Sequence, residues 1–215
     1  MIGVGAYALK DASLLLRIPL AKLRRWAAGY WYSVDDDDRF SEAIVPGRSE
    51  DLDERVLSFD ELMELAVIAF YRSEGVSMAV VREARSNAQV LFDQAFPFAT
   101  QRLRTDGVGI FADLSGVEGI ATDRLRLELS RSQTVLADFI EPFFRERVDF
   151  NDDGESMTFW PFGRSKPIRL DRRRSFGRPT VDGTGVPTFV LAQMRSGGET
   201  LERLAAWYQI PRTRL

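Results

Sequence analysis

Residues 7–28 read YALKDASLLLRIPLAKLRRWAA, and the organisation of the N-terminal half follows from this stretch. Its apolar residues recur at the three- and four-residue spacing of a helix up to Leu16, and again from Leu23 to Ala27. Pro19 interrupts the pattern, but proline is tolerated in the first turn of a helix, where its missing N–H would be unpaired anyway. The stretch therefore predicts two short helices joined by a tight turn, which is a helix-turn-helix.

The outer face of the second predicted helix is basic. If Leu23, Trp26 and Ala27 face inward, Lys22, Arg24 and Arg25 lie toward the other side, on the helix that enters the major groove in DNA-binding helix-turn-helix units. Arg17, in the turn, would be placed for a phosphate. An ordinary two-helix hairpin with a charged outer face is the alternative.

The order of motifs resembles the MerR type of DNA-binding domain. In that family a tyrosine-led helix precedes a recognition helix, as residues 7–12 precede Leu23-Arg24-Arg25-Trp26 here. Residues 58–65 and 70–77 resemble the second helix pair of the family, in which an arginine (here Arg72) precedes an acidic-Gly-Val-Ser turn. The resemblance implies that residues 32–57 form the wing. Independently of the family, Ser58 followed by Glu61 predicts a capping box.

The composition excludes several kinds of chemistry. The chain has 215 residues, 29 basic and 32 acidic side chains, and neither cysteine nor histidine. Disulfides, thiolate nucleophiles and zinc fingers are therefore excluded, together with histidine as a general base or metal ligand. No acid pair has a recognisable orienting base or metal partner, so we expect no enzyme.

The net charge of −3 conceals a strong segregation of charge along the chain. Residues 1–31 sum to +4 and residues 161–215 to +7, whereas residues 32–64 sum to −9 and residues 106–160 to −7. Basic blocks are the electrostatic footprint of a surface that binds a polyanion, because Lys and Arg that neutralise phosphates release counterions. A merely solvated surface is equally compatible with the charge alone.

The middle of the chain has the pattern of β-structure. Residues 108–112 and 124–129 predict strands, residues 135–144 a helix, and residues 148–162 a hairpin. Asp149, Asn151, Asp153 and Gly154 match positions 1, 3, 5 and 6 of an EF-hand loop, but position 12, which needs a carboxylate, is Trp160. We therefore expect a plain Asn/Asp/Gly turn there, and no metal or cofactor in the protein.

The C-terminus repeats the N-terminal pattern at an offset of 192 residues. Leu201 falls on Leu9, residues 210–211 fall on Ile18-Pro19, and Leu215 falls on Leu23. The repeat predicts a second helix-turn-helix whose recognition helix begins at Pro211 and carries Arg212 and Arg214 outward. Because the chain stops one turn into that helix, we expect it to be a piece of a longer protein.

Residues 176–215 resemble the small trihelical domain of a group of bacterial antitoxins. The shared features are Gly-x-Pro at 177–179, Gly-Thr at 183–184, a proline-started helix from Pro187, and Gly-Glu at 198–199 followed by Leu-Ala, Tyr and Ile at 204–210. With the MerR-like start, the whole chain resembles a VapB-type antitoxin. The resemblance implies operator DNA and a PIN-type ribonuclease toxin as partners, and repression of the antitoxin's own operon.

The predicted architecture is α+β and mostly helical. It comprises a MerR-like winged helix-turn-helix domain over residues 1–100, a β-rich middle region with one helix over 101–170, and a trihelical domain over 171–215. We expect a homodimer in the cytoplasm, since palindromic operators require two-fold symmetry and no apolar run is long enough for a membrane span. The predicted DNA-binding residues are Arg17, Lys22, Arg24, Arg25, Arg72, Arg212 and Arg214. The alternative is a ligand-responsive MerR-like regulator with an apolar pocket built from Phe111, Phe139, Phe143 and Phe144.

Overall fold

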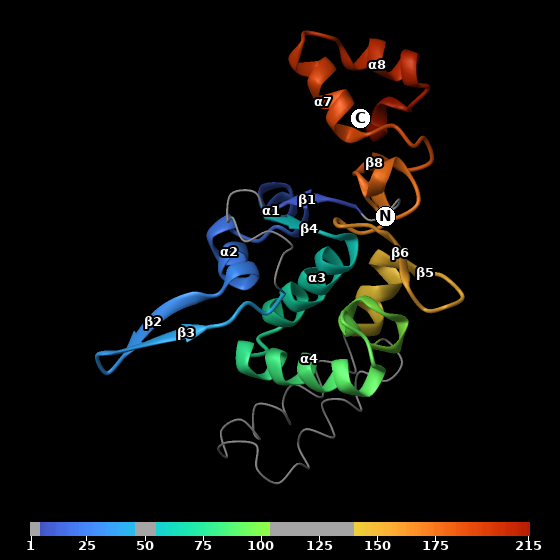
Figure 1. Ribbon diagram of the computed structural model, residues 1–215. Helices are drawn as coiled ribbons and strands as arrows, with labels where there is room; N and C mark the ends of the chain where they lie inside the picture. The colour runs from blue at the N-terminus through green and yellow to red at the C-terminus, as the bar shows by residue number, and fades with distance from the viewer. Residues whose placement is uncertain (1–4, 46–54, 104–139) are drawn as a thin grey trace.

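The protein has a mixed α+β fold in which helices outweigh small antiparallel sheets (Figure 1). The structure, a computed structural model, describes residues 5–45, 55–103 and 140–215. The predicted strands at 108–112 and 124–129, the pocket residues Phe111 and Phe139, and part of the predicted wing lie outside the described residues. Within the described residues, no helix is both long and apolar enough to span a membrane.

The first helix pair consists of α1 (Leu9–Leu16) and α2 (Leu20–Ala28). Leu9, Ala12 and Leu15 are buried on α1, and Leu23, Trp26 and Ala27 are buried on α2. These are the residues whose spacing predicts an inward face, so the prediction of two helices interrupted at Pro19 is confirmed. The core that they enter is the main apolar core of the protein.

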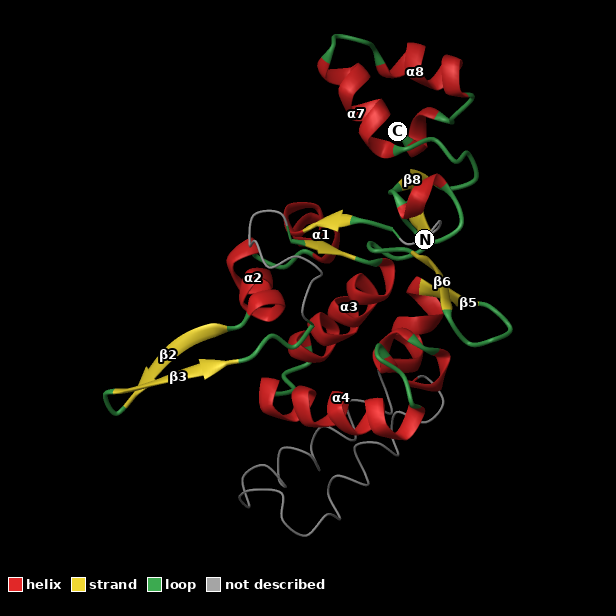
Figure 2. Ribbon diagram, in the orientation of Figure 1, coloured by secondary structure: helices red, strands yellow, loops and turns green. Residues whose placement is uncertain are grey.

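A two-stranded ribbon leaves the end of α2 and projects from the body (Figure 2). Its strands β2 (Tyr30–Val34) and β3 (Asp37–Ser41) pair antiparallel, with Trp31 opposite Phe40. Gly29 is required where the ribbon begins, because its φ is +76° and an added Cβ would lie 2.6 Å from the Ser41 carbonyl oxygen. A second two-stranded sheet is formed by β1 (Tyr7–Ala8) and β4 (Val56–Leu57), which pair antiparallel.

Two longer helices, α3 (Phe59–Ser73) and α4 (Met78–Phe92), complete the N-terminal half, followed by the short turn η1 (Pro97–Ala99). The predicted capping box begins α3. The Ser58 hydroxyl accepts a hydrogen bond from the Glu61 backbone N–H at 3.2 Å, and the Glu61 carboxylate accepts one from the Ser58 N–H at 2.6 Å. Two otherwise unpaired N–H groups at the helix start are satisfied in this way.

Residues 140–147 are helical and lead into a four-stranded antiparallel sheet. Its strands are β5 (Val148–Phe150), β6 (Ser156–Phe159), β7 (Ile168–Asp171) and β8 (Thr180–Val181), in that order. The predicted turn between β5 and β6 is confirmed: the Asn151 side-chain oxygen accepts from the Glu155 N–H at 2.8 Å, and its amide donates to the Glu155 carboxylate at 3.0 Å.

The C-terminal unit follows the 3₁₀ turn η2 (Ser175–Gly177) and contains α7 (Thr188–Ser196), α8 (Leu201–Tyr208) and the 3₁₀ turn η3 (Arg212–Arg214). It has a small core of its own, built on Val181, Leu191 and Ile210. The main core, in contrast, includes residues from Tyr7 to Leu170. The described residues on both sides of position 100 thus share one core, and the domain boundaries stay a prediction.

Two polar contacts tie the segment from β7 to η2, which precedes the C-terminal unit, to the N-terminal half. The Tyr7 hydroxyl donates to the Gly177 carbonyl oxygen at 2.6 Å. The Arg172 guanidinium donates two hydrogen bonds to the Asp60 carboxylate, at 2.9 and 3.1 Å, where α3 begins. Burial raises the pKa of both Tyr7 and Asp60, although Arg172 acts in the opposite direction on Asp60. These contacts join residues more than one hundred positions apart.

Candidate nucleic-acid interface

The turn between α1 and α2 is built by backbone hydrogen bonds around a left-handed residue. Arg17 has φ 54° and ψ 38°, and its N–H and that of Ile18 both point to the Ser13 carbonyl oxygen. The Ser13 hydroxyl closes the turn by donating to the Ile18 carbonyl at 2.6 Å. Pro19, at φ −53° and ψ 132°, then begins α2, because its carbonyl accepts from Lys22 and Leu23. The turn therefore fixes the angle at which α2 leaves α1.

The exposed side of α2 carries Arg24 and Arg25, as the sequence predicts. The Arg25 guanidinium carbon lies 5.3 Å from the centre of the Tyr30 ring at the base of the ribbon. Stacking on a ring orients a guanidinium without neutralising it. This arrangement leaves the positive charge of Arg25 available to an anionic partner on the outer side of the helix.

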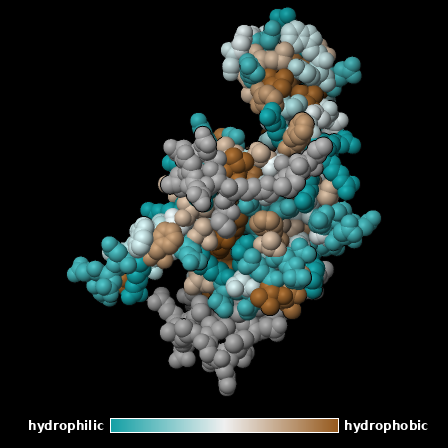
Figure 3. Space-filling view, viewed as in Figure 1, coloured by the Kyte–Doolittle hydropathy of each residue, from teal (hydrophilic) through white to brown (hydrophobic). Residues whose placement is uncertain are grey.

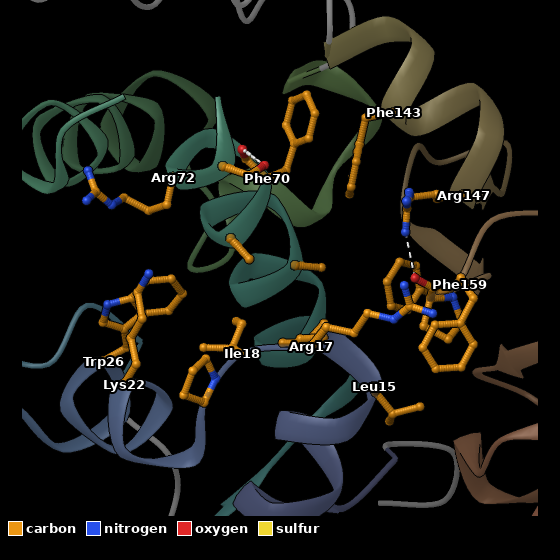
Figure 4. Close-up of a pocket in the computed structure, with 17 residues that line it drawn as sticks. Leu15, Arg17, Ile18, Lys22, Trp26, Phe70, Arg72, Phe143, Arg147 and Phe159 are labelled. Atoms are coloured by element: carbon orange, nitrogen blue, oxygen red, sulfur yellow. Dashed lines mark hydrogen bonds between the residues drawn. The ribbon is translucent and has the colours of Figure 1, made fainter. Parts of the chain in front are cut away.

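The other three cations predicted in the N-terminal half, including the exposed Lys22 of α2, line a cavity of about 370 Å³ (Figure 4). Arg17, Lys22 and Arg72 line it, together with Arg147 from the helical residues 140–147, and we call this space the cationic cavity. The Arg17 guanidinium lies 4.8 Å from the Phe162 ring centre and the Lys22 ammonium 5.1 Å from that of Trp26. Arg72 donates to the Val76 carbonyl. Arg24 and Arg25 do not line the cavity.

Arg147 is the cation that the sequence does not single out. It donates to the Pro161 carbonyl at 2.6 Å, and its guanidinium lies 5.6 Å from the Phe143 ring centre. Arg145, two residues earlier, is exposed and pairs with Glu141. Both arginines lie on one helix in a sequence that alternates charge, so no local pattern separates the inward residue from the outward one. Only the packing of the helical residues 140–147, whose Phe143 ring lies 4.7 Å from the Phe70 ring of α3, distinguishes them.

The tip of the ribbon is strongly acidic. Asp35 and Asp36 form the turn with φ values of 52° and 66°, and Asp38 accepts a hydrogen bond from the Ser33 hydroxyl at 2.6 Å. Behind this hydrophilic tip the ribbon exposes a more apolar stretch with Trp31 and Phe40 (Figure 3). Four consecutive carboxylates, residues 35–38, repel phosphates at close range. Any contact of the ribbon with a nucleic acid must therefore involve its sides and base.

The turn between α8 and η3 has the same backbone conformation as the first turn. Gln209 has φ 54° and ψ 36°, and the N–H groups of Gln209 and Ile210 both point to the Ala205 carbonyl oxygen. Pro211 follows at φ −54° and ψ 133°. The bounds of α1 and α8 also correspond residue for residue at the offset of 192. The sequence repeat is thus confirmed for the first helix and its turn, whereas the predicted recognition helix after Pro211 is only the 3₁₀ turn η3, because the chain ends at Leu215.

The basic residues after the second turn are exposed. Arg212 pairs with Glu202 at 2.9 Å, and Arg214 donates to the Asp182 carbonyl at 3.2 Å. Glu202 is exposed, and a hydrogen bond from its own backbone at the start of α8 lowers its pKa most, with Arg212 acting in the same direction. The C-terminal unit lies well away from α2 (Figure 1). The seven predicted cations therefore form three groups: Arg24 with Arg25, the cationic cavity, and Arg212 with Arg214.

Comparison with known proteins identifies the family. The chain is 31% identical over 219 aligned residues to a protein of Mycobacterium tuberculosis (strain ATCC 25618 / H37Rv) that bears the name "Putative antitoxin VapB45". The alignment covers 96% of this chain and 89% of that protein. This chain belongs to the VapB antitoxin family. Membership gives it the antitoxin part of a toxin–antitoxin system, in agreement with the sequence resemblance.

The fold of this VapB family member has a counterpart among solved structures. The X-ray crystal structure of Rv2018 from Mycobacterium tuberculosis matches with a TM-score of 0.72, covering 97% of this chain and 94% of that chain at 23% identity. At 23% identity the match shows a similarity of fold alone. A comparison with models of known protein families gave no match.

Proposed function

We propose that this VapB family member is a DNA-binding antitoxin that represses its own operon and neutralises a cognate PIN-type ribonuclease. Family membership supports the antitoxin role. The observation that carries the DNA-binding part is the pair of matching turns, each of which is followed by a short basic segment. A helix-turn-helix works by fixing such an angle between two helices, so that the second enters the major groove.

The N-terminal unit acts as a MerR-like winged helix-turn-helix in this proposal. Arg24 and Arg25 on the exposed side of α2 contact the DNA, while Arg17, Lys22 and Arg72 contribute positive potential from the rim of the cationic cavity. The ribbon serves as the wing through its aromatic base, because its tip is acidic. Phosphate neutralisation supplies most of the binding free energy, so the affinity falls as salt rises.

The proposed toxin partner fits the charge of the C-terminal half. A PIN-type ribonuclease has a carboxylate-lined, magnesium-dependent site, which an arginine-rich segment complements electrostatically. The exposed residues Arg173 and Arg174 follow β7 and precede the largely exposed Phe176, so this segment is the part of the C-terminal half that we propose for the toxin contact.

A protein that binds its operator and its toxin acts in the cytoplasm, which is the compartment we infer for it.

The proposed oligomer is a homodimer, since a palindromic operator is read by two-fold symmetric proteins. Multi-angle light scattering of the purified chain tests this directly. We expect twice the mass of one chain. A monomer at micromolar concentration would contradict the dimer and would leave each chain to read both half-sites with its two turns.

The function is tested by co-expressing the chain with the product of the adjacent gene and purifying the tagged antitoxin. We expect a small nuclease to co-purify and to regain ribonuclease activity when the antitoxin is removed. A gel shift on the DNA upstream of the operon tests repression. A co-purifying protein without nuclease activity would contradict the PIN-type partner, while an absent gel shift would contradict autorepression.

The second candidate function is a ligand-responsive MerR-like regulator, and the cationic cavity is the observation that favours it. Its lining differs from the predicted apolar pocket: Phe143 and Phe144 both belong to the main core, and of the two only Phe143 lines the cavity. A transporter or enzyme operon beside the gene would favour this alternative, and a small nuclease gene would favour the antitoxin with DNA binding.

A further inference from the structure

The cationic cavity lies where three parts of the protein meet: the turn of the first helix pair, the C-terminal half of α3, and the residues from 143 to 162 (Figure 4). Its volume of about 370 Å³ falls at the lower end of the range for small-molecule sites. A molecule of one or two rings fits a space of this size. The cavity therefore has the dimensions of a ligand site.

Among the described residues that line the cavity, all the charged ones are basic. Arg17, Lys22, Arg72 and Arg147 line it, and none of the described lining residues is acidic. The contacts of these cations are with aromatic rings and carbonyl oxygens, none of which carries a full negative charge. Like charges that share a partly desolvated space without a counterion repel one another. An anion in the cavity would relieve this repulsion.

Arg17 and Arg147 are the two cations of the cavity that are best placed to bind one anion together. Their side chains approach the same side of the cavity from opposite directions, Arg17 from the turn and Arg147 from the helical residues above it (Figure 4). Burial lowers the pKa of Arg147, and the neighbouring charge of Arg17 acts in the same direction, while Glu146 opposes both. Two guanidinium groups present planar sets of N–H donors that match a carboxylate or a phosphate.

The walls of the cavity add a second chemical requirement. Trp26, Phe70, Phe143 and Phe159 line it, and the Phe70 and Phe143 rings lie 4.7 Å apart. These two rings pack on each other, and with Trp26 and Phe159 they form an apolar, aromatic wall, which favours a ligand with an aromatic body over a purely polar one. A bare inorganic ion would bury no apolar surface against this wall.

We propose that the cationic cavity binds a small aromatic anion, with its carboxylate or phosphate group between Arg17 and Arg147 and its ring against Phe70 and Phe143. Arg24 and Arg25, which contact the DNA in the proposed function, lie outside this site, whereas Arg17 belongs to both proposals. The experiment accordingly uses the protein without DNA.

Isothermal titration calorimetry of the full chain with three probes tests the proposal. The probes are 2-naphthoate, its neutral counterpart 2-naphthamide, and inorganic phosphate. We expect one naphthoate per chain, bound at least about tenfold more tightly than either other probe. Equal binding of naphthoate and naphthamide would contradict the role of the charge, and equal binding of phosphate would contradict the role of the ring. An absence of naphthoate binding up to millimolar concentration would overturn the site.

Substitutions of Arg17 and Arg147 test whether naphthoate binds at these two residues. Glutamine is compatible with this position, because Gln209 holds the same φ and ψ in the matching turn. We expect Arg17→Gln and Arg147→Gln each to weaken naphthoate binding by at least about fivefold. Arg203→Gln is the matched control, since Arg203 also stacks on a ring, that of Trp207, but lies on α8. An equal loss in Arg203→Gln, or none in Arg17→Gln, would overturn the proposal.

Discussion

Arg17 and Gln209 lie 192 residues apart and share one left-handed backbone conformation, with φ 54° at both and ψ values of 38° and 36°. Each follows an eight-residue helix, and an Ile-Pro pair follows each of them. A non-glycine residue in this conformation is uncommon, and its recurrence at equivalent positions shows that the turn geometry itself is repeated. We therefore expect the two turns to have related roles.

The double variant Arg24→Gln/Arg25→Gln should weaken operator binding and flatten its dependence on salt, by roughly one unit of slope for each lost phosphate contact. Fluorescence anisotropy at several salt concentrations measures both quantities. Arg145→Gln is the control, because this exposed arginine lies on the helical residues 140–147. If the double variant binds as the wild type does, the DNA surface lies elsewhere.

The double variant Arg212→Gln/Arg214→Gln tests the C-terminal turn in the same assay. We expect weaker operator binding with little loss of stability, because the Arg212–Glu202 pair is exposed, and such pairs contribute about 0–1 kcal/mol. Thermal unfolding checks the stability. If this variant binds the operator as tightly as the wild type does, while Arg24→Gln/Arg25→Gln binds it more weakly, DNA binding is restricted to the N-terminal unit.

Arg172→Met should lower the free energy of unfolding by about 1–3 kcal/mol, because it leaves the half-buried Asp60 carboxylate without its two charged hydrogen bonds. Arg174→Met, two residues on, is the control, since Arg174 is largely exposed and lies 3.6 Å from Asp171. Urea denaturation measures both. Equal effects of the two substitutions would show that the Asp60 contact is not what holds this segment to α3.

Glu64 should make the stability of the protein depend on pH. Burial raises the pKa of this carboxyl from 4.5 to about 8, although Arg85 at 3.6 Å acts in the opposite direction. Between these values the folded chain retains a proton that the unfolded chain has released. The contribution of this group to stability therefore falls as pH rises through this window, by at most about 1.4 kcal/mol per pH unit.

Glu64→Gln removes this titration. In urea denaturation from about pH 5 to about pH 8, the difference in stability between the variant and the wild type should shift in favour of the variant as pH rises. A difference that stays constant across this window would show that Glu64 titrates near its ordinary value.

Local patterns in the sequence predict much of this fold. The spacing of Leu23, Trp26 and Ala27, the capping box at Ser58, and the Asn151 turn are all confirmed, because each depends on residues within a few positions of one another. The ribbon begins at Tyr30, two residues before the predicted wing, since Gly29 ends α2 directly.

Long-range contacts could not be predicted in this way. The cationic cavity brings Arg17 and Arg72 together with Arg147, and the Tyr7 hydroxyl reaches Gly177, through packing that no periodicity encodes. The repeat is the exception, because both copies of the turn have the same Ile-Pro signature. Local patterns in the sequence indicate the seven candidate cations but neither their separation into three groups nor Arg147, and their role in DNA binding stays a prediction.

The binding of the full chain to the DNA upstream of its operon, compared with a scrambled duplex of equal length, tests the proposed role of the two turns. Anisotropy titrations from about 50 to about 300 mM salt should show preference for the upstream DNA and a binding constant whose logarithm falls linearly with the logarithm of the salt concentration. Equal affinity for both duplexes, or no binding at low salt, would contradict a DNA-binding antitoxin built on the turns at Arg17 and Gln209.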